Sequence, residues 1–291
     1  MKQAFLVMCH GNFDILMITM KILDNWHNDF FIHIDKKTPN ISIIQEQLQK
    51  CVKKSNVYFV KNLSIYWGGY SQIEGELILI KAALENKTEY GYLHLLSGSC
   101  LPIKAENEIY DFFNNSHKIE YVQCEDLQQK FFDRIKYYRF FQNYNNKMIR
   151  IINRLLIKVQ KIFHINRINK SKKYSYGSNW FSITSDFADY VLQHISEIQR
   201  TFKYCKNADE LFLQTILINS PFISKLYHDS DSNHQNLRFI KWPEIGDASH
   251  PITLTSNDLN ELLSSKCLFA RKFDLNTDRN IVLQLKNKLI S

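Results

Sequence analysis

Apolar residues in the first part of the chain alternate between strand-like runs and helical spacing. Residues 4–8 form a short apolar run, and residues 13–25 repeat apolar side chains at the spacing of a helix face. Residues 29–35 are then almost continuously apolar, which is typical of a strand buried in a parallel sheet. A strand, a helix and a second strand in this order predict an α/β fold.

The same alternation continues as far as residue 113. Helices are expected at 42–53, 72–83 and 105–113, and strands at 57–60 and 92–96. Asp35 follows the second strand, at the carboxyl end where open α/β sheets bind ligands. A polar strand end is common, so this position alone leaves its role open.

A glycine pair, Gly68 and Gly69, lies between Trp67 and Tyr70 just before the helix at 72–83. Glycine lets the backbone approach a ligand closely, and the two aromatic faces suit a base or a sugar. A glycine turn filled by its own aromatic neighbours explains the pattern equally well.

The segment 176–221 has the strongest pattern in the second half of the chain. It predicts a strand over 180–184 and then an amphipathic helix capped by Ser185 or Asp186. Two acids, Asp209 and Glu210, follow and open a strongly apolar helix. In one interpretation Asn207 and Glu210 form a capping box. In the other, Glu210 is a general base on a rigid helix start, which requires one carboxylate oxygen to stay free.

Composition narrows the function classes. The 291 residues are 45% hydrophobic, which is enough for a full core, and no apolar run is long enough to span a membrane. Neither GxGxxG nor GxxxxGK occurs, so a Rossmann dinucleotide site and a P-loop are not supported. The ten histidines lack metal-ligand spacing, so zinc is not indicated.

Charge and cysteine usage suggest partners and a compartment. The six cysteines form no CxxC pair and no signal peptide is evident, so we expect reduced thiols in a cytoplasm. The net charge of +8 favours an acidic partner, which includes nucleotide phosphates, nucleic acid and an anionic membrane. A last strand is expected at 238–242.

Several sequence segments, in this order, resemble the core-2/I-branching β-1,6-N-acetylglucosaminyltransferase family (glycosyltransferase family 14), which also contains the peptide xylosyltransferases. They are FLVMCHGN, FFIHIDKK, WGGYSQIEGELILIKAAL, YLHLLSGSCLPIK, GSNWFSIT with DYVLQ, ADELFLQTILINSPF, NLRFIKW and LFARKFD. The resemblance implies a GT-A type fold, a Rossmann-like mixed sheet flanked by helices. It also implies an inverting reaction that needs neither a metal nor another cofactor. We expect one domain over 1–291, made of a nucleotide-sugar half (1–125), a basic helical insert (126–175) and an acceptor and catalytic half (176–291).

The resemblance also assigns roles to residues and favours Glu210 as the catalytic base. The residues expected to bind the donor are His10, Asp35, Trp67, Ser97, Gly98, Arg271 and Lys272. Those expected to bind the acceptor are Trp180, Asp209, Trp242, Arg134 and Lys136. Two adjacent cations in an apolar frame suit the negative charge that develops on a UDP leaving group.

The chain departs from the family at two places. Cys100 stands where animal members have Asp, so the donor sugar cannot be carried over. The stretch 243–266 lacks an Arg that animal members have; His250 lies near its place, so Lys272 is expected to do more of the phosphate work. A DxD pattern at Asp229 and Asp231 lies in a late polar loop, and we interpret it as a chance match rather than a metal site.

The segment 130–173 is strongly basic, with isoleucines and leucines alternating with its charges at helical spacing. A helix on an anionic membrane surface, a nucleic-acid site and a solvated face packed on the domain all explain it. The nucleic-acid hypothesis explains none of the family segments, so no nucleic-acid partner is expected.

The sequence therefore predicts an inverting, metal-independent glycosyltransferase that moves a sugar from a UDP donor to a hydroxyl of a glycan or lipid-linked glycan. N-acetylglucosamine is the first choice and xylose or another sugar the alternative. A bacterial surface polysaccharide or lipopolysaccharide pathway is expected, in the cytoplasm or peripherally on the inner face of its membrane. The alternative of another class is a nucleic-acid- or carbohydrate-binding module without catalysis.

Overall fold

A six-stranded mixed sheet organises the computed structural model, which describes residues 1–144, 147–229, 234–243 and 250–290. The strand order is β3-β2-β1-β4-β9-β6. The strands are β1 (Lys2–Cys9), β2 (Asn28–Ile34), β3 (Asn56–Phe59), β4 (Tyr90–Ser97), β6 (Tyr121–Val122) and β9 (Phe181–Thr184). β1 to β4 run parallel, whereas β9 pairs antiparallel with both β4 and β6.

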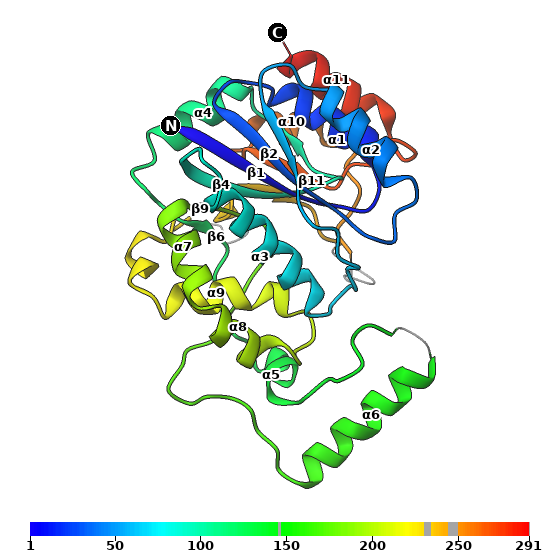
Figure 1. Ribbon diagram of the computed structural model, residues 1–291, viewed down its shortest axis with the longest axis vertical. Coiled ribbons are helices and arrows are strands. Elements are labelled where there is room, and N and C mark those ends of the chain that lie inside the picture. Colours follow the sequence, from blue (N-terminus) through cyan, green and yellow to red (C-terminus); the bar gives the residue numbers. More distant parts are fainter. Residues whose placement is uncertain (145–146, 230–233, 244–249, 291) are drawn as a thin grey trace.

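Helices cover both faces of this sheet (Figure 1). One face carries α3 (Ser71–Leu84), α7 (Ser185–Gln193) and α9 (Phe212–Ile218), and the other carries α1 (Phe13–Ile22), α2 (Ile41–Lys50) and α4 (Glu106–Asn114). Alternate residues of β1 explain the two layers: Leu6 belongs to the first core and Phe5 to the second. The expected GT-A type arrangement, a Rossmann-like mixed sheet flanked by helices, is confirmed.

A smaller sheet joins the C-terminal part of the chain to the end of β4. Its order is β10 (Arg238–Ile240), β11 (Phe269–Arg271) and β5 (Leu101–Pro102). The short helix η4 (Ser256–Asp258) precedes α10 (Leu259–Ser264), and the chain then ends in α11 (Arg279–Leu289). A third core, between α1, α10 and α11, holds this part against the main sheet.

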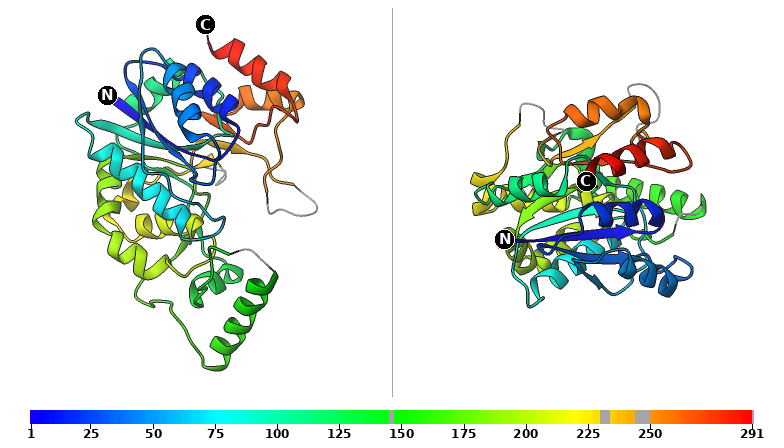
Figure 2. Two further views of the ribbon diagram at one scale, coloured as in Figure 1. Left: turned by 45° about the vertical axis from the view of Figure 1, so that its right-hand side comes forward. Right: turned by 90° about the horizontal axis from the view of Figure 1, so that it is seen from above.

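The basic segment forms α5 (Gln129–Lys136) and α6 (Lys147–Ile162), and β7 (Glu125–Asp126) pairs with β8 (Ser175–Tyr176) where this segment leaves and rejoins the body. Figures 1 and 2 show α6 at the end of the molecule opposite α11. Of the helices in the described residues, none combines the length and the apolar character needed to cross a bilayer.

Several boundaries differ from the sequence prediction. The helix expected over 13–25 ends at Ile22, and the one expected to run through Ile195 is divided into α7 and α8 (Ile195–Phe202). β10 ends at Ile240, so Trp242 lies in a loop rather than in a strand. Glu210 ends a short 3-10 helix, η1 (Ala208–Glu210), instead of opening an α-helix. A second short 3-10 helix, η2 (Pro221–Lys225), follows α9.

A fully buried arginine connects the two sheets. Arg238 of β10 is 1% exposed, and its guanidinium donates hydrogen bonds to the carbonyl oxygens of Leu95 (3.2 Å), Phe181 (2.5 Å) and Asn236 (2.5 Å) and to the hydroxyl of Ser182 (2.7 Å). Burial lowers the pKa of this guanidinium. Because a buried cation is costly unless its protons are bonded, the position of β10 is tied to these acceptors on β4 and β9.

We expect Arg238→Met to lower the free energy of unfolding by roughly 3 kcal/mol or more, because the thioether keeps most of the volume but leaves the carbonyl oxygens unpaired. Urea unfolding of the variant, beside the exposed control Arg279→Met, measures this loss. A variant within about 1 kcal/mol of the wild type would show that the buried network is dispensable.

Candidate active site

The carboxyl ends of β1 and β4 meet at the edge where the strand order reverses direction. A methyl group on Gly98 would lie 2.5 Å from the carbonyl oxygen of Gly11, so only glycine fits there. The side-chain amide of Asn12 donates to the hydroxyl of Ser99 at 2.7 Å. In an open α/β sheet this reversal point is where ligands bind. The predicted donor residues His10, Ser97 and Gly98 therefore come together at one edge.

Asp35 reaches the same edge from the end of β2. Its backbone amide donates to the carbonyl oxygen of Cys9 at 2.8 Å, which joins the ends of β2 and β1. The carboxylate is 6% exposed and accepts from the backbone amides of Lys37 (2.8 Å) and Ile65 (3.3 Å). These bonds fix the loops around the edge. A contact between Asp35 and the donor stays a prediction.

Trp67 lies in the loop that follows β3. Its side chain is 65% exposed, and its ring centroid is 6.0 Å from that of His250. Residue 250 is the position that the sequence placed near the missing arginine, so the fold brings this histidine to the predicted donor side.

Arg271 and Lys272 are brought to the β4 edge by strand pairing. β11 pairs antiparallel with β5, and the amide of Phe273 donates to the carbonyl oxygen of Ser99 at 3.0 Å. The Arg271 guanidinium lies 4.3 Å from the ring centre of Trp180, and burial lowers its pKa. These cations thus lie beside the loop that contains Ser97 and Gly98, although about 170 residues separate them in the sequence.

Trp180 supports Arg271 in this structure. The indole is only 7% exposed, and one of its faces carries the guanidinium. Little of the ring is left for a sugar to stack on, so the predicted acceptor contact of Trp180 is not supported by the geometry of this state and stays a prediction.

The carboxylate of Glu210 is held by an ion pair. Its Oε2 accepts from Nη1 of Arg134 at 2.6 Å, while its backbone carbonyl accepts from the amide of Gly177 at 3.0 Å. The Glu210 side chain is 28% exposed. Neither η1 nor α9 has a side-chain cap, so the capping-box interpretation of Asn207 and Glu210 is wrong.

Backbone and side-chain bonds attach η1 to the start of α3. The amide of Asn207 donates to the carbonyl oxygen of Gly68 at 2.9 Å, and Nε2 of Gln72 donates to Oδ2 of Asp209 at 2.8 Å. Gly68 has a φ of +71°, and a methyl group on it would lie 2.5 Å from Oδ1 of Asn207. The absence of a side chain at Gly68 therefore makes room for Asn207, and an approach of a ligand to the glycine pair stays a prediction.

A second carboxyl group lies beside Asp209, and the sequence analysis did not identify it. Glu76 of α3 is 1% exposed, and neither of its carboxyl oxygens has a hydrogen-bond partner among the described residues. Burial, and then the charge of Asp209, raises the pKa of Glu76 well above its ordinary value. Burial, and then the charge of Glu210, raises the pKa of Asp209 to about 7. The sequence did contain a signal for Glu76, because this acid lies one helical turn after Gln72 on an otherwise apolar helix face.

The other predicted acceptor residues lie on α5, in η1 and in the loop after β10. The Arg134 guanidinium lies 4.5 Å from the ring centre of Phe131, and Lys136 Nζ lies 5.4 Å from that of Tyr137. Asp209 is only 6% exposed and accepts a hydrogen bond from Gln72, so its side chain offers little surface to an acceptor in this structure. Trp242 is 47% exposed in the loop after β10, and its ring is available for stacking. These acceptor roles stay predictions.

The DxD pattern is partly described. Asp229 pairs with Lys266 at 2.6 Å and accepts from the hydroxyl of Tyr227 at 3.2 Å, whereas Asp231 lies outside the described residues. Within residues 1–144, 147–229, 234–243 and 250–290, no group of three His, Cys, Asp or Glu side chains could hold a metal ion. Metal independence stays a prediction.

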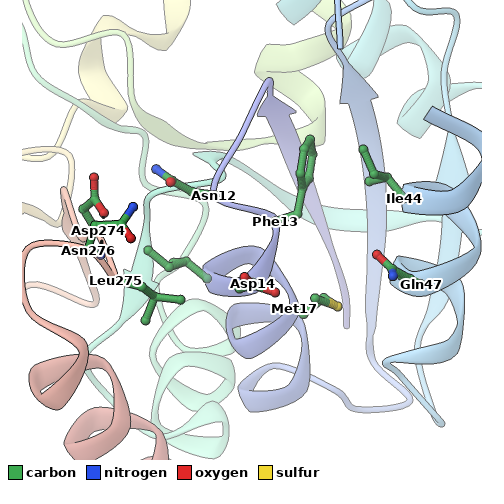
Figure 3. A pocket seen from close by; sticks show the side chains of 10 residues that line it. Asn12, Phe13, Asp14, Met17, Ile44, Gln47, Asp274, Leu275 and Asn276 are labelled. Carbon is green, nitrogen blue, oxygen red and sulfur yellow. Dashed lines mark hydrogen bonds between the residues drawn. The ribbon is translucent and has the colours of Figure 1, made fainter. Parts of the chain in front are cut away.

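A surface pocket of about 400 Å³ lies between α1, α2 and the segment that precedes α11 (Figure 3). Phe13, Ile44 and Leu275 are among the residues that line it. None of the predicted donor, acceptor or catalytic residues lines this pocket, although Asn12, which bonds Ser99 at the sheet edge, lies on its border.

Glu76→Gln should stabilise the protein at pH 8 but have little effect at pH 5. The folded-state pKa of Glu76 is raised above 4.5, so the wild type loses stability as the pH rises above that value, and a neutral glutamine removes this loss. Thermal unfolding at the two pH values, with the exposed Glu74→Gln as control, measures the difference. Equal effects at both pH values would contradict the buried, protonated state.

A sequence model of the core-2/I-branching enzyme family matches residues 3–264. The mouse N-acetyllactosaminide beta-1,6-N-acetylglucosaminyl-transferase is 23% identical over 94% of this chain and 69% of its own length. The beta-glucuronosyltransferase GlcAT14A of Arabidopsis thaliana is 23% identical over 90% of this chain and 59% of its own length. The xylosyltransferase oxt of Drosophila pseudoobscura pseudoobscura is 22% identical over 89% of this chain and 30% of its own length. The match extends over the sheet edge, η1 and the basic segment alike, so the chain belongs to the core-2/I-branching enzyme family and is a glycosyltransferase.

Proposed function

We propose that this glycosyltransferase transfers N-acetylglucosamine from UDP-N-acetylglucosamine to a hydroxyl of a glycan acceptor, with inversion and without a metal. The observation that supports the proposal is how the carboxylate of Glu210 is bonded. Arg134 engages Oε2 and holds the carboxylate in place, and no group of the described residues bonds Oε1. That oxygen is left for an acceptor hydroxyl, as a general base requires.

The transfer is one displacement. Glu210 takes the proton from the acceptor hydroxyl while the acceptor oxygen forms a bond to the anomeric carbon. The bond from that carbon to the diphosphate breaks, and UDP leaves with the electron pair from the opposite face of the sugar, which inverts the anomeric centre. Arg271 and Lys272 stabilise the charge that develops on the diphosphate, where a metal would otherwise act.

The donor sugar is the finer part of the proposal. The names of the relatives include acetylglucosaminyl-, glucuronosyl- and xylosyltransferases, so members with similar identity to this chain differ in the sugar. UDP-xylose or another UDP-sugar is therefore the alternative donor. The loop that contains Ser97, Gly98 and the buried Cys100 lies against Arg271 and is a place where donors can be discriminated.

We place the reaction in the cytoplasm, with a glycan or lipid-linked glycan acceptor of a surface polysaccharide or lipopolysaccharide pathway at the inner face of the membrane. The six cysteines, which are all free thiols, support a reducing compartment. The net charge of +8 supports a polyanionic or anionic-lipid environment.

Glu210→Gln should keep UDP binding but reduce turnover by about 100-fold or more, because the amide cannot accept the acceptor proton. Calorimetry with UDP and release of UDP in the presence of acceptor separate the two effects. Glu85→Gln, at an exposed glutamate that pairs with Lys81, is the matched control. Full turnover in the Glu210 variant would exclude this residue as the base.

A donor screen tests the sugar and the metal together. UDP-N-acetylglucosamine, UDP-xylose, UDP-galactose and UDP-glucose are each supplied with EDTA, and released UDP is measured. We expect release from one donor, with N-acetylglucosamine first, because fixed cations replace the metal. Release that appears only after Mn²⁺ is restored would contradict metal independence, and no release with no UDP binding would contradict the transferase proposal.

A further inference from the structure

Helix α6 has an unusual distribution of charge. Its sixteen residues contain five basic side chains and no acid. These are Lys147, Arg150, Arg154, Lys158 and Lys161. Their spacing of three or four residues places them on one side of the helix. Among the described residues, only Lys161 of the five forms an ion pair, with Asp133 at 3.5 Å.

A second side of α6 is apolar and exposed to solvent. Its large side chains recur at helical spacing and are 46% to 72% exposed. They are Met148 (65%), Ile151 (46%), Leu155 (53%), Val159 (46%) and Ile162 (72%). Phe163, directly after the helix, is 73% exposed. A contiguous apolar stripe of this kind on a protein surface marks an interaction site.

The side that faces the body is different again. Gln160 is 5% exposed, and its amide group both donates to the carbonyl of Tyr138 (2.9 Å) and accepts from the amide of that residue (2.7 Å). This polar contact ties the helix to the body, while the stripe from Met148 to Ile162 faces outward. The side chains of Ile149, Ile152 and Leu156 are half-buried, so the alternative of a solvated helix packed on the domain accounts for this side of α6 but not for the exposed stripe.

We propose that α6 lies in the plane of a bilayer surface rich in anionic lipids. The apolar stripe is inserted between headgroups and acyl chains, and the adjacent basic side chains bind lipid phosphates. A nucleic acid would match the charges but leave the apolar stripe in water. A second copy docked through the same stripe would bring two rows of like charges together. The combination of apolar and basic sides fits a membrane better than either.

This contact would orient the active site. Figure 1 shows α5 and α6 at the same end of the molecule. Because Arg134 of α5 pairs with Glu210, a membrane-bound α6 would keep the proposed base toward the lipid surface. The inference that the acceptor is lipid-linked rests on the proposed function. Lipid binding by α6 does not, because it can be measured without turnover.

Flotation of the full chain with vesicles tests the proposal. Vesicles of phosphatidylcholine alone are compared with vesicles that also contain phosphatidylglycerol. We expect binding to the anionic vesicles only, and weaker binding as salt is raised. Arg154→Gln with Lys158→Gln, and separately Leu155→Gln with Val159→Gln, should each weaken it roughly tenfold or more. Ile43→Gln with Lys50→Gln, at exposed positions of α2, is the matched control and should bind as the wild type.

Three outcomes would overturn the proposal. The first is no flotation of the wild type with anionic vesicles. The second is a control that loses binding as much as the α6 variants do. The third is a dimer, seen by sedimentation, that the Leu155 and Val159 variant dissociates. UDP release in solution is measured for every variant and should be unchanged, so a failure of the proposed transferase activity would be distinguished from a failure of lipid binding.

Discussion

The guanidinium of Arg238 determines how the two sheets of this glycosyltransferase are arranged. It is a buried cation whose two terminal nitrogens donate to acceptors that include carbonyl oxygens on β4 and β9, so a shift of β10 would leave these polar groups unpaired. Because β11 pairs with β10 and with β5, this one side chain also determines where Arg271 and Lys272 lie relative to the β4 loop. The electrostatics proposed for the leaving group therefore depend on a residue that does not belong to the site.

The proposed base is held from two directions. From one side, η1 is bonded to the start of α3 through Gly68 and Gln72, and from the other, Arg134 of the basic segment pairs with Glu210. The buried Glu76 and Asp209 add a carboxyl pair behind the base. Burial raises the pKa of both, and the charge of Asp209 adds to the shift at Glu76 while that of Glu210 adds to the shift at Asp209. The site therefore concentrates three acids next to one arginine, an arrangement that is common where proteins shift pKa values for function.

The basic segment (126–175) contributes both to the proposed catalytic site and to the proposed membrane contact. Its first helix contributes the partner of Glu210, and its second presents an apolar stripe beside a row of positive charges. Because Gln160 attaches α6 to the body by a polar contact, the apolar stripe is free for a lipid surface rather than used in folding. A transferase that acts on lipid-linked glycans would gain from such a contact, since it confines enzyme and acceptor to the same surface.

The sequence by itself determined the α/β class, because continuous apolar runs alternating with helical spacing leave no other way to bury both faces of the sheet. It also determined the family, through short segments in a fixed order, and singled out Glu210, Arg271 and Lys272. Only the tertiary structure decided that Gly68 makes room for Asn207, that Trp180 carries Arg271, and that Glu76 lies beside Asp209. These are contacts between residues far apart in the chain, and local spacing contains no information about which distant groups will meet. The outward orientation of the apolar side of α6 was likewise a tertiary result, because periodicity predicts an apolar face but not what covers it.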